Sequence, residues 1–225
     1  MSNVIPRAAI FDMDGLMLDT ERIAIQCWVQ AAQDINLQLA SHIPYGMVGM
    51  HMSKVKAYLT AELGAAAPVD QLIAATHEHY LQATQAAIPH RPGVLDMLHW
   101  LQEQGLPCAV ATSTQRRLAE HHLQQAGLAP FFEFLVCGDE IEHPKPAPDI
   151  YLKAVARLGL QAAECVVFED SIVGVQAAHS AGCRVIMVPD LRAPDDATLA
   201  LGVPILESLT HARDEVRNWL AHAAA

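Results

Sequence analysis

The pattern of apolar and polar positions divides the chain into three parts. A short apolar run covers Ala8 to Phe11, and its lack of alternation is typical of a strand that is buried on both faces. From Thr20 to about Ile88 the apolar positions instead recur at helical spacing. After Ile88, apolar runs of strand length alternate with helical patterns. The pattern therefore predicts one strand, then a helical insert, then an alternation of strands and helices.

The helical insert is expected to hold about four helices, because Ser53 and Pro68 are typical of helix starts and Gly64 of a helix end. The remainder of the chain predicts four further strands and five helices. The strands are expected at about 107–112, 134–136, 165–170 and 184–189, and the helices at about 94–105, 115–125, 148–158, 171–181 and 208–221.

This order of elements predicts an α/β fold. Strands that alternate with helices form a parallel sheet that is covered on both faces, so we predict an open, doubly wound parallel sheet with an inserted four-helix cap domain. The core domain is expected to comprise residues 1–18 and 90–225, and the cap domain residues 19–89. The segment IPHRPG, which begins at Ile88, is suited to a stiff hinge because proline and glycine punctuate the chain there.

Composition narrows the class of protein. A chain of 225 residues with 52% hydrophobic and 17% charged residues has ample material for a packed core, which excludes disorder. A net charge of -11 with scattered Lys and Arg argues against binding to nucleic acid. Neither a signal peptide nor a run of about 18 apolar residues is present in this sequence. We therefore expect a soluble cytoplasmic protein that binds neither nucleic acid nor membrane.

The five cysteines are odd in number, widely spaced and form no C-x-x-C pair. We interpret them as buried thiols of a reducing compartment, because free cysteine is commonly a buried apolar residue. A long heptad pattern is also absent from the sequence, so a monomer is expected.

Two aspartates follow the first predicted strand directly. Ligands bind beyond the carboxyl ends of parallel strands, and side chains alternate along a strand, so Asp12 and Asp14 are expected to lean towards the same side. Two carboxylates this close repel, which implies either a hard metal ion or a shared proton. A turn with solvated acids is the alternative for an isolated D-x-D sequence. A calcium loop of the EF-hand type is excluded, because the glycine and the entering helix that it needs are missing.

Polar groups also follow two later strands. Thr112 and Ser113 precede a predicted helix, where hydroxyls and free N–H groups can bind an anion, although the same residues cap ordinary helices. Glu169 and Asp170 follow an apolar run, with helix capping again as the alternative. Lys145 lies between two prolines that restrict its backbone, although a lysine in a loop is usually solvated. Together these groups supply a cation site, a nucleophilic carboxylate, hydroxyl donors and a lysine, which suit phosphoryl transfer.

These motifs resemble those of the haloacid dehalogenase superfamily, specifically its phosphatase and β-phosphoglucomutase-like branch with a helical cap. The sequence FDMDGLMLDTE looks like the first motif of that family, VATST the second, HPKPAPDIY the third and VVFEDSIVGVQAA the fourth. The motifs occur in the family's order and are separated by an insert of cap size. The resemblance covers nearly the whole chain.

The resemblance implies roles for these residues. Asp12 would attack phosphorus and form an aspartyl phosphate, which water then hydrolyses. Asp14 would protonate the leaving alcohol and later deprotonate the water. Thr112 and the Ser113 backbone would hold the phosphoryl oxygens, and Lys145 would pair with the phosphoryl group and Asp12.

The resemblance also implies a Mg²⁺ cofactor. Its ligands would be Asp12, the main-chain carbonyl of Asp14 and Asp170, with Glu169 close by or coordinating through water. The substrate would be a small phosphorylated metabolite, most simply a sugar phosphate. The cap would close over it by bending near residues 16–19 and 89–92, and Thr20, His51 and Met52 are candidate substrate contacts.

Two alternatives to a phosphatase remain open. Sugar phosphomutases of this type carry a cap arginine in the loop that corresponds to residues 48–53, and the sequence VGMHMS lacks one, which favours hydrolysis. The non-enzymatic alternative is a phospho-acceptor regulatory module, against which the cap insert and Asp14 argue. Asp14 also favours phosphate esters over organohalides, since the dehalogenases of the family have no acid at that position.

Overall fold

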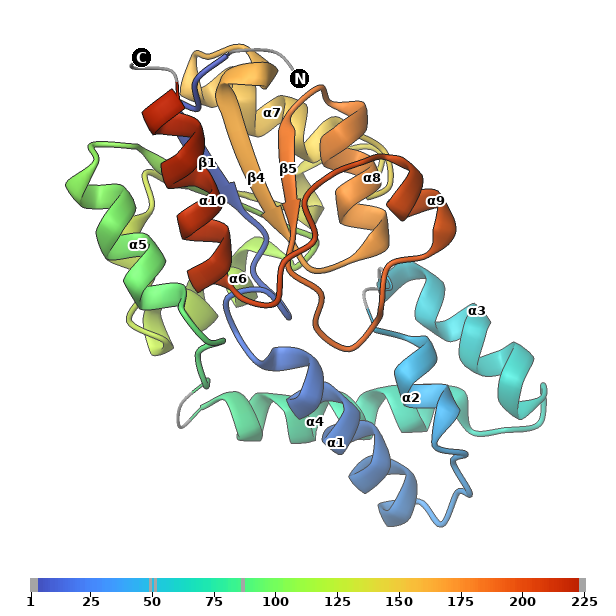
Figure 1. The fold of residues 1–225 in the computed structure, drawn as a ribbon. Coiled ribbons are helices and arrows are strands. Elements are labelled where there is room, and N and C mark those ends of the chain that lie inside the picture. Colours follow the sequence, from blue (N-terminus) through green and yellow to red (C-terminus); the bar gives the residue numbers. More distant parts are fainter. Residues whose placement is uncertain (1–3, 49, 51, 86–87, 223–225) are drawn as a thin grey trace.

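A parallel five-stranded sheet forms the centre of the protein. The computed structural model describes residues 4–48, 50, 52–85 and 88–222. The strand order in the sheet is β3-β2-β1-β4-β5 (Figure 1). The strands are β1 (Ala8–Phe11), β2 (Cys108–Thr112), β3 (Phe134–Cys137), β4 (Cys165–Glu169) and β5 (Arg184–Met187). Every residue of β1, β2 and β4 is buried, as their apolar runs predict.

The register of the sheet brings the candidate residues to one edge. In the central strand, Ile10 lies opposite Ala109 of β2 and Val167 of β4. Because all the strands run in the same direction, their carboxyl ends meet at a single edge of the sheet. Asp12, Thr112 and Glu169 end or directly follow three neighbouring strands there.

Helices cover both faces of the sheet, which confirms the predicted doubly wound α/β fold. Helices α5, α6 and α10 pack with Phe11 on one face, and α7 and α8 pack with Ile10 on the other. The short helix α9 lies beyond β5. The bounds are α5 (Val94–Glu103), α6 (Arg116–Gln125), α7 (Asp149–Leu158), α8 (Ile172–Ser180), α9 (Asp196–Ala200) and α10 (Leu209–His222). Helix α9 was not predicted, because five residues are too few to display a helical period.

Between β1 and β2 the chain forms a helical insert beyond the carboxyl edge of the sheet (Figure 1). It comprises α1 (Thr20–Asp34), α2 (His42–Gly46), α3 (Met52–Leu63) and α4 (Val69–Thr84). The insert has an apolar cluster of its own, which includes Trp28, Leu59 and Leu72. Three-residue 3-10 helices connect other elements at Ala129–Phe131, Gly138–Glu140 and Ala162–Glu164.

The two connections between the insert and the sheet run side by side. The backbone N–H of Asp19 donates to the Pro89 carbonyl at 2.9 Å, and that of Arg91 donates to the Met17 carbonyl at 2.8 Å. Leu18 and His90 form an antiparallel bridge between them. We call residues 16–19 and 88–92 the connector ribbon.

All five cysteines are buried and free, as predicted. Within the described ranges, the structure contains no helix with the length and apolar character needed to cross a membrane.

Candidate active site

The first predicted site residue, Asp12, directly follows the central strand. Its N–H continues the pairing of β1 with β4 by donating to the Phe168 carbonyl at 3.0 Å, which fixes the backbone at this point. The side chain is buried, and its Oδ1 accepts a hydrogen bond from Lys145 Nζ at 2.6 Å. The structure therefore holds the Asp12 carboxylate against a cation at the carboxyl edge of the sheet.

Lys145 is a buried ammonium with three acceptors. Besides Asp12, it donates to Glu169 Oε1 at 2.6 Å and to the Ala111 carbonyl at 3.2 Å, which uses all three of its N–H bonds. Burial acts to lower the pKa of Lys145, but the charges of Asp12 and Glu169 outweigh it and raise that pKa above its ordinary value. The lysine is therefore charged, and a solvated loop lysine is excluded.

Glu169 accepts four hydrogen bonds. Its Oε1 accepts from Lys145 and from the Tyr151 hydroxyl, the latter at 2.7 Å. Its Oε2 accepts from the N–H and Oγ of Ser171 at 3.0 and 2.9 Å. Gly174 makes this arrangement possible, because a Cβ there would lie 1.7 Å from Glu169 Oε1. Ser171 also caps helix α8, as the helix-capping interpretation predicted, because its Oγ accepts a hydrogen bond from the N–H of Gly174 at 3.1 Å.

Three buried carboxylates converge at this edge. One oxygen each of Asp12, Glu169 and Asp170 lies within 4.8 Å of the others. Glycine at position 15, with a φ of +81°, allows the loop after β1 to pass close to them, since a Cβ there would lie 2.3 Å from Asp170 Oδ2. No side chain of the described residues donates a hydrogen bond to Asp170, in contrast to the four donors on Glu169.

The electrostatics of this acidic cluster call for a cation. Burial raises the pKa of Asp12 to about 8, and the charges of Glu169 and Asp14 raise it while Lys145 lowers it. Burial, and then the charges of Glu169 and Asp12, raise the pKa of Asp170 well above its ordinary value. A bound divalent cation would stabilise the ionised forms of both carboxyls. An all-oxygen donor set of this kind suits a hard cation such as Mg²⁺. Asp12 and Asp170 are the carboxylates best suited to be its ligands.

Asp14 lies apart from the lysine and is held by hydroxyl groups. Its Oδ1 accepts from Thr20 Oγ1 at 2.7 Å, and its Oδ2 accepts from Thr114 Oγ1 at 2.7 Å and from Thr112 Oγ1 at 3.3 Å. The two aspartates of the D-x-D sequence therefore have different partners: an ammonium for Asp12 and three hydroxyls for Asp14. This difference suits two different chemical roles.

Of the four remaining predicted site residues, the structure describes the positions of Ser113 and Thr20 but not the side chains of His51 and Met52. Ser113 lies between Thr112 and Thr114 in the turn before α6, so its backbone is at the same edge of the sheet. Thr20 begins α1 and faces Asp14. His51 lies outside the described residues. Met52 begins α3, and its side chain lies outside what the structure describes, so both substrate contacts stay predictions.

Thr114 and Tyr151 contact the site although their sequence positions predict no role for them. Thr114 belongs to the polar strand end TST, so its hydroxyl was a detectable signal. Tyr151 lies in α7, where its position in the sequence is indistinguishable from that of a core aromatic residue.

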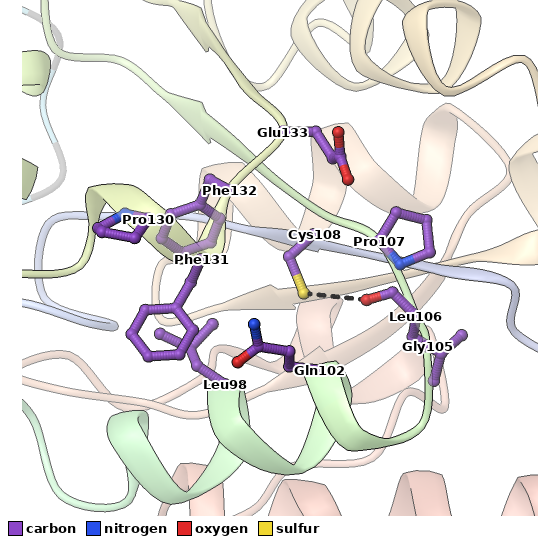
Figure 2. Close-up of a pocket in the computed structure, with 10 residues that line it drawn as sticks. All are labelled: Leu98, Gln102, Gly105, Leu106, Pro107, Cys108, Pro130, Phe131, Phe132 and Glu133. Carbon is purple, nitrogen blue, oxygen red and sulfur yellow. Dashed lines mark hydrogen bonds between the residues drawn. The ribbon is translucent and has the colours of Figure 1, made fainter.

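A cavity of about 460 Å³ lies elsewhere. Figure 2 shows it between Leu98 and Gln102 of α5, the Phe131 and Phe132 side chains and the start of β2 at Cys108. Cys108 begins β2 and Thr112 ends it, so this cavity is at the amino end of the strand, opposite the carboxylates. It contains none of the residues that could handle a phosphoryl group.

Comparisons with known proteins agree with this geometry. The profile of the family described as haloacid dehalogenase-like hydrolase matches residues 9–188. A phosphorylated carbohydrates phosphatase from Thermotoga maritima is 31% identical over 175 residues, which cover 78% of this chain and 81% of that protein. A fructose-1-phosphate phosphatase from Escherichia coli strain K12 is 31% identical over 183 residues, which cover 80% of this chain and 94% of that protein.

A solved structure shares the fold. The crystal structure of a Thermotoga maritima protein, provisionally named as a β-phosphoglucomutase, superposes with a TM-score of 0.79 at 28% identity and covers 94% of this chain and 99% of that one.

Proposed function

The chain belongs to the haloacid dehalogenase-like hydrolase family, and we propose that it is a Mg²⁺-dependent phosphatase of sugar phosphates and similar small phosphomonoesters. The observation that carries this proposal is the contrast between two aspartates. Asp12 is paired with Lys145 at 2.6 Å beside two further carboxylates, whereas Asp14 is surrounded by hydroxyls. A nucleophile and a general acid need such different surroundings. The phosphatase names of the relatives support the same reaction.

In the proposed reaction Asp12 is the nucleophile. Its carboxylate attacks phosphorus in line with the leaving oxygen and forms an aspartyl phosphate. The Lys145 ammonium balances the charge of Asp12 and of the incoming phosphoryl group, and Glu169 holds that ammonium from the other side. When a phosphoryl group is bound, the Thr112 hydroxyl would turn its single hydrogen from Asp14 to a phosphoryl oxygen, and the Ser113 backbone N–H would bind another, since both lie at the turn before α6.

Asp14 is the proposed general acid and base. A proton on its carboxyl passes to the leaving alcohol, and the resulting carboxylate then takes a proton from the water that hydrolyses the aspartyl phosphate. Thr20 and Thr114, which donate to it at 2.7 Å, fix the direction of this carboxyl. The reaction regenerates Asp12 and releases inorganic phosphate and the alcohol.

Asp12, Asp170 and the main-chain carbonyl of Asp14 would hold Mg²⁺, with Glu169 close by or acting through water because its oxygens already accept four hydrogen bonds. When bound, the ion would keep Asp12 ionised and offset the phosphoryl charge.

We propose that residues 19–89 form a cap domain over a core of residues 1–18 and 90–225. The insert lies beyond the carboxyl edge of the sheet, where the carboxylates are, and meets the core through the connector ribbon (Figure 1). Closure there would exclude water from the phosphoryl group and would let the inner face of the insert select the alcohol.

Phosphate release from a panel of sugar phosphates and a chromogenic phosphomonoester tests the proposal. We expect multiple turnovers with Mg²⁺, none with chelator, and none for Asp12→Asn. The name of the similar Thermotoga structure keeps a sugar phosphomutase as the second candidate. Interconversion of sugar phosphate isomers without phosphate release would favour the mutase, and a single labelling event without turnover would favour a phospho-acceptor module.

A further inference from the structure

Two arginine side chains bind one carbonyl group of the edge strand β3. This strand is at one end of the strand order, so its outer side has no neighbouring strand among the described residues. Nη2 of Arg116 and Nη1 of Arg157 donate to the Leu135 carbonyl at 2.8 and 2.9 Å. A carbonyl oxygen has two lone pairs, so the two guanidinium groups use its full capacity as an acceptor. None is left for the N–H of another strand.

The two arginines reach this carbonyl from opposite faces of the sheet. Arg116 begins α6 and Arg157 lies in α7, and these helices pack on opposite faces. Both guanidinium groups are held in place. That of Arg116 donates to Glu140 through Nε and to Glu120 through Nη1, the latter at 3.0 Å. That of Arg157 lies 4.0 Å from the centre of the Phe134 ring, a cation–π contact.

The segment around β3 has the composition of a strand that pairs readily with a copy of itself. Residues 131–137 have the sequence FFEFLVC, in which three of the seven residues are aromatic, Glu133 is the single charge and proline is absent. High β-propensity with little charge and no proline is typical of segments that self-associate. An edge strand of this kind is a ready template for a further strand unless something blocks it.

The opposite edge of the sheet is blocked in a different way. In β5 the N–H of Met187 donates to the Pro204 carbonyl at 2.8 Å, and the Met187 carbonyl accepts from the N–H of Leu206 at 2.8 Å. Ile205 forms a parallel bridge with Met187. The chain itself therefore covers the β5 edge. At the β3 edge the two guanidinium groups take the place of such a segment.

We propose that Arg116 and Arg157 keep the β3 edge closed to a second copy of this chain. Without them, the Leu135 carbonyl is free to accept an N–H from another molecule. Two copies related by a twofold axis would then pair β3 with β3 in antiparallel fashion and join their sheets. With both arginines present, the same pairing would break their hydrogen bonds and bring like charges together. The inference is independent of the catalytic chemistry.

The test is the oligomeric state of Arg116→Ala/Arg157→Ala, measured by analytical ultracentrifugation from about 10 to 500 µM. We expect the wild type to keep the monomer mass throughout, and the double variant to approach twice that mass at the highest concentration. A double variant that stays monomeric would overturn the proposal.

Arg117→Ala/Arg217→Ala is the matched control, because it removes two exposed arginines from α6 and α10. It should stay monomeric. Both double variants lose the same positive charge from a chain that is already acidic, which on its own opposes association. Net charge therefore cannot explain a difference between them. A wild type or a control that associates as strongly as Arg116→Ala/Arg157→Ala would contradict the proposal.

Amide hydrogen exchange locates the contact. Pairing through β3 should slow exchange at residues 134–137 of the double variant by about tenfold as the concentration rises. A variant that associates because it is less stable should instead exchange faster there. Association without slower exchange at residues 134–137 would overturn the proposal, since the copies would then meet elsewhere.

Thermal unfolding identifies a double variant that fails to fold. In that case Arg157→Ala alone decides, because Arg157 is exposed and Arg116 keeps its bonds to Glu140 and Glu120. The single variant frees one of the two lone pairs of the Leu135 carbonyl. Self-association with slower exchange at residues 134–137 would support the proposal, and a monomer mass at every concentration would overturn it.

Discussion

Tyr151 donates a hydrogen bond to Glu169 at 2.7 Å, and the Lys145 ammonium lies 5.1 Å from the centre of the same tyrosine ring. The three side chains form one buried unit in which Glu169 receives a phenol and an ammonium on the same oxygen. Because Lys145 also donates to Asp12, the position of the proposed nucleophile depends on α7 as well as on the strand that carries it.

Replacing Tyr151 by phenylalanine should weaken both the fold and the reaction. The ring stays, but Glu169 Oε1 loses one of its two donors and attracts Lys145 more strongly, away from Asp12. We expect the free energy of unfolding to fall by about 1–3 kcal/mol and kcat to fall several-fold. Denaturant unfolding and steady-state kinetics measure the two effects. Tyr45→Phe, which removes the hydroxyl of an exposed tyrosine in α2, is the control. Unchanged values of both would show that Lys145 is held without Tyr151.

Gly174→Ala should disrupt the site more severely. A Cβ at this position would lie 2.0 Å from the carboxyl carbon of Glu169, so the carboxylate must move and give up its bonds to Lys145 and Ser171. We expect a loss of about 3 kcal/mol in the free energy of unfolding and little remaining activity.

Gly105→Ala is the matched control for this substitution. Gly105 has a φ of +67°, and a Cβ there meets nothing within 4 Å, so the change costs about 1 kcal/mol of backbone strain and should leave kcat unaltered. Full activity in Gly174→Ala would contradict the described packing of Glu169 against α8.

Asp190 ties the connector ribbon to the core. Its side chain is 0% exposed, and its Oδ1 lies 2.8 Å from nitrogens of both Arg22 and Arg91. In Asp190→Asn these two guanidinium groups lose a shared countercharge. Because both are partly exposed, we expect a loss of about 1–3 kcal/mol, below the value for a fully buried pair, and faster amide hydrogen exchange at residues 16–19 and 88–92. Asp214→Asn, in an exposed ion pair with Arg217, should change neither quantity. Slow exchange in Asp190→Asn would mean that the ribbon is stable without it.

The sequence predicted the strands and most of the site, because the strands are apolar runs and three of them, β1, β2 and β4, end in or directly precede charged or hydroxyl groups. Such signals are local. The contacts that position them are not local: Tyr151 of α7 meets Glu169 on the face of the sheet that α7 covers, and Asp190 meets two arginines that lie far away along the chain. In the sequence Tyr151 looks like a core aromatic residue and Asp190 like a loop acid, so only the tertiary structure reveals their contacts.

Mg²⁺ should bind more tightly as the pH rises. Burial raises the pKa of Asp12 to about 8. In the metal-free folded protein the Asp12 carboxyl therefore keeps its proton over a range of pH in which the same carboxyl is ionised in the unfolded chain. The metal-free fold is therefore destabilised as pH rises towards 8, and Mg²⁺, which binds the ionised form, offsets that loss. The Tm in Mg²⁺ minus the Tm in chelator should grow between about pH 5 and pH 8. A difference that is constant or shrinks with pH would contradict the assignment of Asp12 as a ligand, and Asp12→Asn should weaken the trend, with the remainder due to Asp170, whose pKa is also raised by burial.

The covalent role of Asp12 is the central claim, and acid quenching tests it most directly. The protein, in molar excess over a sugar phosphate, is mixed with that sugar phosphate and Mg²⁺. The reaction is quenched with acid at short times, and the protein is then digested and analysed by mass spectrometry. We predict a phosphoryl group on Asp12 that forms before free phosphate, decays at the rate of phosphate release, and is absent from Asp12→Asn. Release of phosphate with no phosphoryl group on Asp12 at any time, or turnover by Asp12→Asn, would contradict the account.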